Sequence, residues 1–185
     1  ALPEDREDMA PAFEHHKEAA LPVIRDTGVE ARLILGDAYG QSSPVTLQFE
    51  AFYLDVVLEA GAAFPLPDNH EDRGVYVTSG AVDVAGQTFE AGRMMVFRPG
   101  DQISLHAGQQ GARLMALGGS TMNESRYIWW NFVSSSKDRI ADAKEAWQKA
   151  DWESGPFSLP PGDTDEFIPI SAALARTKPR EAQPR

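Results

Sequence analysis

A long series of short apolar runs, broken at close intervals by Gly and Pro, constrains the fold of this chain more than any other feature. The series extends from Val29 to Phe132. Its clearest run, Phe52 to Glu59, alternates large apolar residues with mixed ones, which is the period-two pattern of a half-buried strand. Repeated runs of this kind predict an all-β domain over residues 29–133, built as a β-sandwich or a small barrel.

Turn signals divide the rest of this series into further strands. Val75 to Val77 predicts a strand, Ser79-Gly80 a tight turn, and Val82 to Val84 the second strand of a hairpin. Four more strands are expected at Gln87 to Phe89, Met94 to Phe97, Ile103 to Leu105 and Arg113 to Leu117. Short strands at such spacing place most of the core in a single sheet domain.

The segment from Arg126 to Trp147 joins an aromatic run to an amphipathic helix with almost no connector. Apolar side chains interleave along this run and fall on both faces of a strand, so we expect a strand that is covered on both sides; they are Tyr127, Ile128, Trp129, Trp130, Phe132 and Val133. Ser135 to Asp138 fits the S-x-x-[DE] capping box, and Ile140, Ala143 and Trp147 recur at helical spacing. The sequence therefore predicts one C-terminal helix over residues 134–152.

Outside these elements we expect extended arms. Residues 1–28 combine acids with three prolines and predict an extended N-terminal arm. Residues 153–171 are rich in Pro but also apolar, which indicates an arm packed along a surface. Residues 172–185 carry four basic residues against one acid and predict a disordered basic tail, which leaves the remainder of the chain strongly acidic.

Composition limits the classes of function. With 185 residues, 42% of them hydrophobic, the chain can bury one good core. Cysteine is absent, which excludes a thiol nucleophile or a thiolate metal site and suits a cytoplasmic protein. The net charge of -11 argues against direct nucleic-acid binding. No apolar run is long enough to span a membrane, and the acidic start is unlike a signal peptide, so we expect a cytoplasmic location.

The order of several segments resembles the C-terminal half of the pirin family. The segments are ARLILG (31–36), FYLDVVLEAGAAF (52–64), GVYVTSGAVDVAGQTFEAGRMMVFRPGD (74–101), ARLMALGG (112–119) and RYIWWNFVSSSKDRIADAKEAW (126–147). The resemblance covers nearly the whole chain and implies a cupin-like fold, a double-stranded β-helix. Pirins are bicupins, so it also implies a partner: an N-terminal cupin domain, or a second copy of this chain in its place.

In that family a His-x-His motif, a further His and an acid of the N-terminal cupin are thought to hold iron. The complete protein would then be a redox-responsive transcriptional co-regulator or an oxygenase of the quercetin 2,3-dioxygenase type. This chain lacks that motif. The resemblance therefore implies no catalytic, cofactor-binding or metal residue here, with iron expected only in the N-terminal cupin.

The general cupin pattern can nevertheless be aligned with residues 61–80. The acid position falls on Arg73, and the two His positions fall on Pro67 and Asn69, or on Leu66 and Asp68 with the longer spacing. Ile103 occupies the position of the third His. A cation and an apolar side chain cannot serve as ligands of a divalent ion, so we expect a metal-free cupin with a structural or partner-binding role.

An alternative is a stand-alone enzyme or small-molecule binder with a non-metal pocket in the barrel. Its candidate pocket residues are Asn69, His70, Arg73 and Met95, and Arg73 would pair with an anionic substrate. A third possibility is an interaction module that uses the aromatic strand and the basic tail.

Other polar residues have simpler interpretations. His70 lies beside acids, so it is either a solvated loop residue or part of a small His/Asp/Glu ligand set. His15, His16 and His106 are interpreted as surface residues, and Ser134 and Lys137 as part of a helix start rather than a catalytic S-x-x-K motif.

Overall fold

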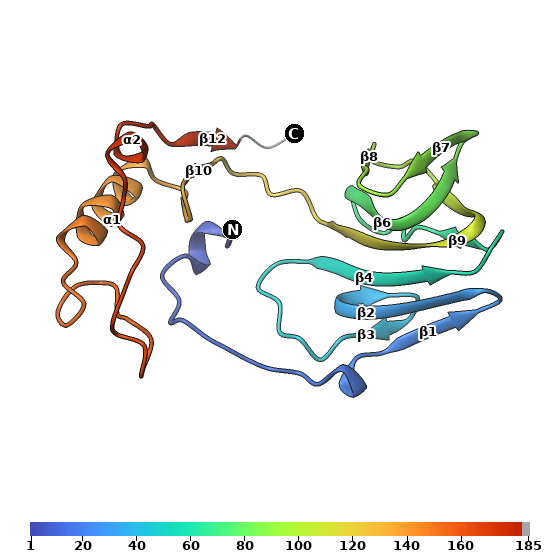
Figure 1. The fold of residues 1–185 in the computed structure, drawn as a ribbon, viewed down its shortest axis with the longest axis horizontal. Helices are drawn as coiled ribbons and strands as arrows, with labels where there is room; N and C mark the ends of the chain where they lie inside the picture. Colours follow the sequence, from blue (N-terminus) through green and yellow to red (C-terminus); the bar gives the residue numbers. More distant parts are fainter. Residues whose placement is uncertain (183–185) are drawn as a thin grey trace. The chain divides into compact units, whose positions relative to one another are not determined.

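The computed structural model describes residues 1–182, which form two compact units (Figure 1). The sheet unit comprises Ala10–Thr121, and the terminal unit combines Ala1–Met9 with the chain from Met122 onward. The predicted N-terminal arm over residues 1–28 is therefore divided between two units and is not a single extended segment. Its first part forms a 3-10 helix, η1 (Glu4–Arg6), and its last part contains a second 3-10 helix, η2 (Glu18–Ala20), and a strand.

The sheet unit contains one sheet of nine strands. Along the sheet the order is β1-β2-β4-β9-β6-β7, with β3 paired to β2, β5 to β9 and β8 to β6. Their bounds are β1 (Val23–Asp26), β2 (Val29–Ala38), β3 (Gln41–Ser42), β4 (Ala51–Leu58), β5 (Ala63–Pro65), β6 (Asp72–Val84), β7 (Gln87–Glu90), β8 (Met94–Phe97) and β9 (Ser104–Gly119).

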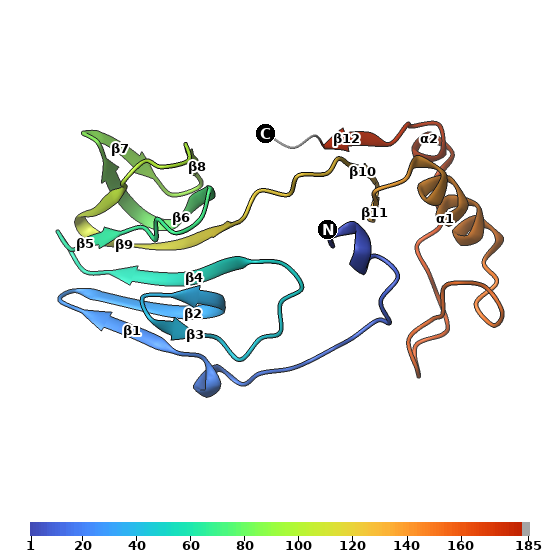
Figure 2. The ribbon, with the colours of Figure 1, turned by 180° about the vertical axis from the view of Figure 1, so that it is seen from behind.

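The sheet folds over on itself to enclose its core. Register shifts in the β6–β9 ladder, one of them between Gly80 and Val82, mark where these long strands bend. Figures 1 and 2 show β7 and β8 curving away from the layer formed by β1, β2 and β4. The side chains enclosed between the layers are large and apolar; fully buried examples are Leu33, Leu54, Val75, Leu105 and Leu114. The expected all-β sandwich is confirmed, and the sheet stays open instead of closing into a barrel.

Strand β4 shows why these residues form a sheet. Phe52, Leu54, Val56 and Leu58 are all buried, whereas Tyr53, Asp55 and Val57 on the other face are half-buried or exposed. Because alternate side chains of a strand point to opposite faces, the sequence pattern determines which face enters the core. The prediction for this strand is confirmed.

Two predicted boundaries are wrong because β6 and β9 run through them. Ser79-Gly80 is a bend inside the 13-residue β6 and not a hairpin turn. At Gly80, which has a φ of +71°, an added Cβ would lie 2.2 Å from the Gly111 carbonyl oxygen, so glycine permits the close crossing of β6 and β9. The hairpin turn lies at Ala85-Gly86, between β6 and β7, where both residues have positive φ. Similarly, the strands predicted at Ile103 to Leu105 and at Arg113 to Leu117 are covered largely by the single strand β9.

In the terminal unit, the expected single aromatic strand is instead a hairpin. β10 (Arg126–Trp129) pairs with β11 (Phe132–Ser134), and Trp129 lies opposite Phe132. Trp130 occupies the intervening turn with a φ of 54°, which is unusual for a bulky residue. Its ring packs edge-to-face against Phe132 and Trp147, and these contacts compensate for the unfavourable backbone.

The helix that follows is α1 (Lys137–Lys149). Its N-cap is Ser136, whose side chain accepts a hydrogen bond from the Arg139 amide, so the predicted cap at Ser135 is one residue too early. Ser135 instead donates its hydroxyl and amide to the carboxylate of Glu7, in the N-terminal segment. No helix in the described part of the chain has the length and apolar character needed to cross a bilayer.

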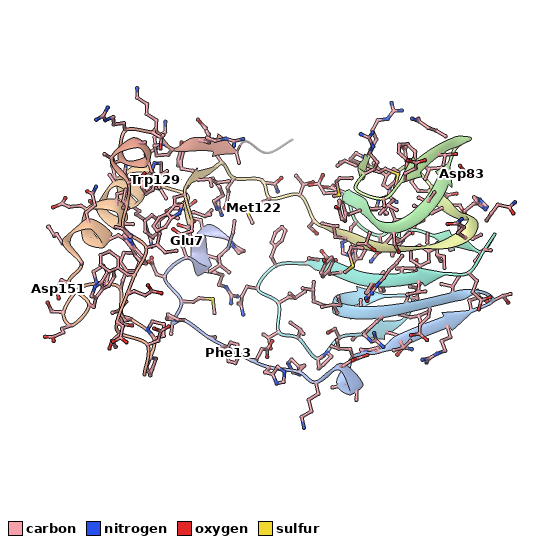
Figure 3. The ribbon with its side chains drawn as sticks, in the orientation of Figure 1. Glu7, Phe13, Asp83, Met122, Trp129 and Asp151 are labelled. Carbon is pink, nitrogen blue, oxygen red and sulfur yellow. The ribbon has the colours of Figure 1, made fainter. Side chains whose placement is uncertain are left out.

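Glu7, labelled in Figure 3, holds the N-terminal segment against the rest of the terminal unit. Its carboxylate is almost fully buried and lies 3.4 Å from Nε of the buried Arg126. Arg126 also donates to the Leu2 carbonyl oxygen through Nε and Nη2. A buried ion pair of this kind needs such additional hydrogen bonds to offset desolvation.

The expected disordered basic tail is wrong for residues 172–182. Ser171 caps a short helix, α2 (Ala172–Ala175), and β12 (Arg180–Ala182) pairs with β10, because that edge of β10 offers free backbone groups. The rest of the predicted tail, residues 183–185, lies outside the described residues. The Pro-rich arm packs on the aromatic residues of the helix and hairpin, where the Phe157 ring stacks on Phe132.

Candidate metal position, mouth cavities and exposed apolar patch

Arg73 lies on β6 at the position that the cupin pattern gives to an acidic ligand. Only 2% of the residue is exposed. Its Nη1 donates to the Pro67 carbonyl oxygen, and its Nη2 donates to the carbonyl oxygens of Arg98 and Asp101, at 3.3, 3.2 and 2.6 Å. The guanidinium therefore joins the loop before β6 to the loop after β8, and its positive charge faces carbonyl dipoles instead of a carboxylate.

This environment does not fit a bound iron. A buried guanidinium in a ligand position would repel a divalent cation, and Ile103 offers no donor atom. Within residues 1–182, no group of three or more His, Asp or Glu side chains lies close enough together to hold a metal ion. The predicted ligand set of His70 with neighbouring acids is therefore not formed by these residues.

His70 is a buried residue, which contradicts the interpretation of a solvated loop. It is 5% exposed because its ring stacks on Phe52, with centroids 5.3 Å apart. Its Nε2 lies 3.3 Å from the Asn69 amide nitrogen, and its Nδ1 lies 4.0 Å from a carboxylate oxygen of Glu50. Among described residues, Nδ1 has no hydrogen-bond partner.

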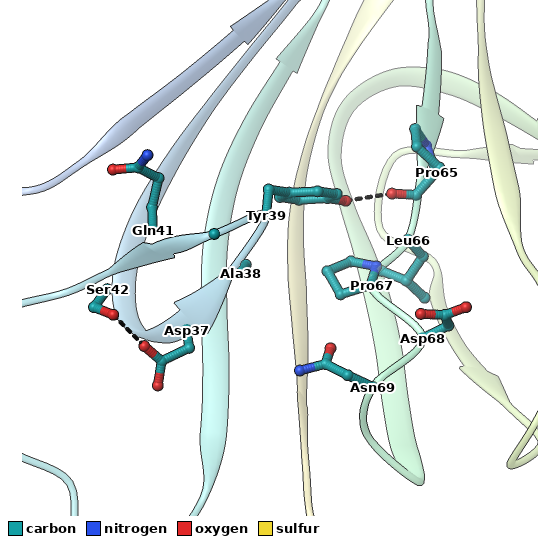
Figure 4. Close-up of a pocket in the computed structure, with 11 residues that line it drawn as sticks. Asp37, Ala38, Tyr39, Gln41, Ser42, Pro65, Leu66, Pro67, Asp68 and Asn69 are labelled. Carbon is teal, nitrogen blue, oxygen red and sulfur yellow. Dashed lines mark hydrogen bonds between the residues drawn. The ribbon is translucent and has the colours of Figure 1, made fainter.

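Two cavities open where β2, β3 and the loop before β6 meet, and we call this region the mouth. The first, of about 570 Å³, is lined by residues 37–42 and 65–69 (Figure 4). The second, of about 370 Å³, is lined by Asp37, residues 47–51, Asn69 and His70. Asp37 and Asn69 line both cavities, so these two residues mark where the cavities adjoin.

The mouth brings together only part of the predicted pocket. Asn69 and His70 line it, whereas Arg73 is occupied by three carbonyl groups and Met95 is buried in the core. The pocket was predicted inside the barrel, but Leu and Phe side chains fill that interior. Sequence reasoning also missed Tyr39, Glu50 and Asp37, which come from segments distant from residues 69–73.

Tyr39 stands at the rim of the first cavity in a strained turn. Tyr39 and Gly40 both have positive φ, as a two-residue turn between β2 and β3 requires, and tyrosine rarely adopts this conformation. The ring packs edge-on against Phe64, and its hydroxyl donates to the Pro65 carbonyl oxygen (Figure 4). Burial, and then the nearby negative charge of Asp68, raise the pKa of the Tyr39 hydroxyl, which therefore stays a neutral donor.

An exposed apolar patch covers the outer face of β6 and β8. It consists of Tyr76, Met94 and Val96, which are 41%, 50% and 54% exposed, and we call it the β6–β8 patch. Tyr76 lies directly opposite Met94, and Val96 lies opposite Gly74. These three side chains make this face a candidate surface for packing against another protein.

Comparison with known proteins now decides the family. Residues 53–153 match the pirin C-terminal cupin domain. A pirin-like protein of Caulobacter vibrioides is 41% identical over 171 residues, which cover 92% of this chain and 57% of that protein. The chain belongs to the pirin family.

Two further similar proteins carry the name of an oxygenase. A Pseudomonas aeruginosa protein, named as a candidate quercetin 2,3-dioxygenase, is 33% identical over 84% of this chain and 49% of its own length. The crystal structure of quercetin 2,3-dioxygenase from Acinetobacter baumannii matches with a TM-score of 0.82 and 25% identity, covering 97% of this chain and 58% of that one. The expected cupin fold is thus confirmed, and the chain spans about half the length of these relatives.

Proposed function

We propose that this pirin C-terminal cupin holds no metal itself and acts by packing against a second cupin domain, which carries iron. The single observation that carries the proposal is Arg73, a buried cation where a ligand carboxylate would stand. In place of a metal ligand, Arg73 hydrogen-bonds three backbone carbonyl groups of two loops. The position then connects the loops and does not bind a metal. The alternative of a pocket inside the barrel is not favoured, because Leu and Phe side chains fill the interior.

The β6–β8 patch supplies the packing surface in this proposal. A cupin domain is itself a sandwich of sheets, so its outer face can lie flat against the exposed face of β6 and β8. The partner would be the N-terminal cupin that the pirin resemblance implies or, where that domain is absent, a second copy of this chain. Both partners would remove Tyr76, Met94 and Val96 from water.

For the complete protein we propose an oxygenase activity of the quercetin 2,3-dioxygenase type, located in the iron-bearing cupin and in the cytoplasm. Two of the relatives carry that name, which supports the oxygenase over a transcriptional co-regulator. In this scheme the chain contributes no group to the chemical step. This chain would affect the oxygenase activity only by stabilising and orienting the iron-bearing cupin domain.

Metal analysis tests the metal-free assignment. The chain is incubated with ferrous iron without oxygen, desalted and analysed for metal content, with the Caulobacter relative treated in the same way. We expect iron in the relative and far less than stoichiometric iron in this chain. Stoichiometric iron that survives desalting in this chain would show that the assignment is wrong.

A further inference from the structure

The mouth contains one buried polar atom whose hydrogen-bonding capacity is unused. Asn69 presents its amide nitrogen to Nε2 of His70, so Nε2 accepts and the proton of the neutral ring resides on Nδ1. Nδ1–H is then a donor that has no partner among the described residues, on a side chain that lines the second cavity. An unused buried donor is costly in a folded protein, which makes it a marker for a ligand atom.

The distance from His70 to Glu50 specifies the kind of atom that fits. At 4.0 Å, Nδ1 and the nearest carboxylate oxygen of Glu50 are too far apart for a direct hydrogen bond. An atom that bridges them must accept a hydrogen bond from Nδ1–H and donate a hydrogen bond to the carboxylate. A hydroxyl group does both, whereas an ammonium group only donates and a carboxylate or phosphate only accepts.

The remainder of the mouth is suited to further hydroxyl groups. Asp37 and Asn69 line both cavities, and Asp68 lines the first, so carboxylate acceptors and an amide with both functions surround the opening. Figure 4 shows Asp37 and Asn69 on opposite sides of the first cavity, with the ring of Tyr39 at its rim. Tyr39 is 41% exposed, and the hydrogen bond from its hydroxyl to the Pro65 carbonyl oxygen holds the ring in place. The exposed ring face can therefore pack against the C–H groups of a ligand.

We propose that the mouth of this cupin binds a neutral polyhydroxylated small molecule, such as a monosaccharide or a cyclic polyol. One ligand hydroxyl bridges Nδ1 of His70 and the carboxylate of Glu50, and further hydroxyls bond to Asp37 and Asn69. The carboxylates of Asp37, Glu50 and Asp68 repel anionic ligands. The cavity volumes of about 570 and 370 Å³ lie in the range of small-molecule sites. This site is independent of the packing role proposed above.

Titration of the isotope-labelled full chain with myo-inositol, D-glucose and D-xylose, followed by NMR, tests this proposal. Cyclohexanol is the matched control, because it keeps a six-membered carbon ring but has one hydroxyl. We expect saturable shifts of the Asn69 side-chain amide and the His70 ring with at least one polyol, and no such shifts with cyclohexanol.

Three variants locate the binding. Glu50→Gln removes the charged acceptor and His70→Phe removes the donor while keeping a ring against Phe52, so each should weaken binding by about tenfold. Glu90→Gln changes an exposed carboxylate on β7 and should bind like the unchanged chain.

Three results would overturn the proposal. One is the absence of saturable shifts with any of the polyols, which would mean that only water occupies the gap. Another is equal shifts with cyclohexanol, which would indicate recognition of the apolar ring alone. The third is unchanged affinity in both Glu50→Gln and His70→Phe. None of these results bears on the metal content or the association state of the chain, so the two proposals fail separately.

Discussion

Arg73 shows how one side chain can change the role of a cupin position. Its guanidinium is buried with no carboxylate partner among residues 1–182, and three carbonyl oxygens from two loops surround it. Carbonyl dipoles compensate for part of the desolvation of the cation, and the planar group with several donors can reach all three at once. Arg73 is therefore a joint between loops, and its interactions have measurable consequences for stability.

We predict that Arg73→Met lowers the free energy of unfolding by about 2–4 kcal/mol, because methionine fills the space but leaves three carbonyl groups without their donor. Urea unfolding followed by circular dichroism measures the loss. Arg93→Met, which changes an exposed arginine just before β8, is the control and should cost less than about 0.5 kcal/mol. Equal stability of the two variants would contradict the role of Arg73 as a joint.

The same residue shows the limit of the sequence pattern. The spacing of Gly61 and Gly80 placed Arg73 at a ligand position, and this alignment needs no structure. The three carbonyl groups that bind Arg73 come from residues 67, 98 and 101, and no local pattern links them. His70 was misjudged for a similar reason, since the ring that buries it belongs to Phe52 on another strand.

At the scale of elements, the cross-strand ion pair of Asp55 and Arg113 joins β4 to β9 at the centre of the sheet. Nε and Nη2 of Arg113 donate to the two carboxylate oxygens of Asp55, at 2.9 and 2.6 Å. The side chain of Asp55 is 13% exposed, and that of Arg113 is 56% exposed. The hydrogen bonds from Arg113 lower the pKa of Asp55 below its ordinary value, although partial burial acts in the opposite direction.

This lowered pKa predicts an acid-dependent contribution to stability. Because the carboxylate is favoured in the folded state, its contribution is fully present above the ordinary pKa of aspartate and is lost as the pH falls through the lowered value. We expect Asp55→Asn to cost about 1 kcal/mol at neutral pH and nearly nothing well below pH 4. Urea unfolding across this pH range measures the difference, and a cost that stays constant with pH would refute the assignment.

Elements were predictable from the sequence where one local pattern determined them. The alternation in β4 and the helical spacing of Ile140, Ala143 and Trp147 identified a strand and a helix. The long strands β6 and β9 were divided wrongly, since a glycine that permits a close crossing looks like a glycine that makes a turn. The turn at Trp130 could not be predicted from the local sequence, because tryptophan is rare at positive φ. Here the packing of its ring against Trp147 stabilises the turn.

At the scale of the whole molecule, the two units differ in what stabilises them and in which candidate sites they contain. The terminal unit joins the N-terminal segment to β10 through the Glu7–Arg126 ion pair and has an aromatic core around Phe132 and Trp147. The sheet unit carries the cupin fold, the mouth and the β6–β8 patch. Sequence comparison identified the family, but the patch became evident only when β8 was paired to β6.

The central claim, that the chain acts by association through its β6–β8 patch, predicts a specific pattern of variants. Met94→Gln combined with Val96→Thr makes the patch polar without touching the core. Val57→Thr is the matched control, because Val57 is a single exposed valine on β4. Polar replacement weakens association because less apolar surface leaves water when the faces meet.

Light scattering coupled to size-exclusion chromatography, which gives the molar mass as a function of concentration, tests this claim most directly. Without an N-terminal cupin, the unchanged chain and Val57→Thr should associate into dimers, whereas the double variant should remain monomeric and equally folded. A chain that is monomeric at every concentration, or a double variant that associates as strongly as the unchanged chain, would contradict the account.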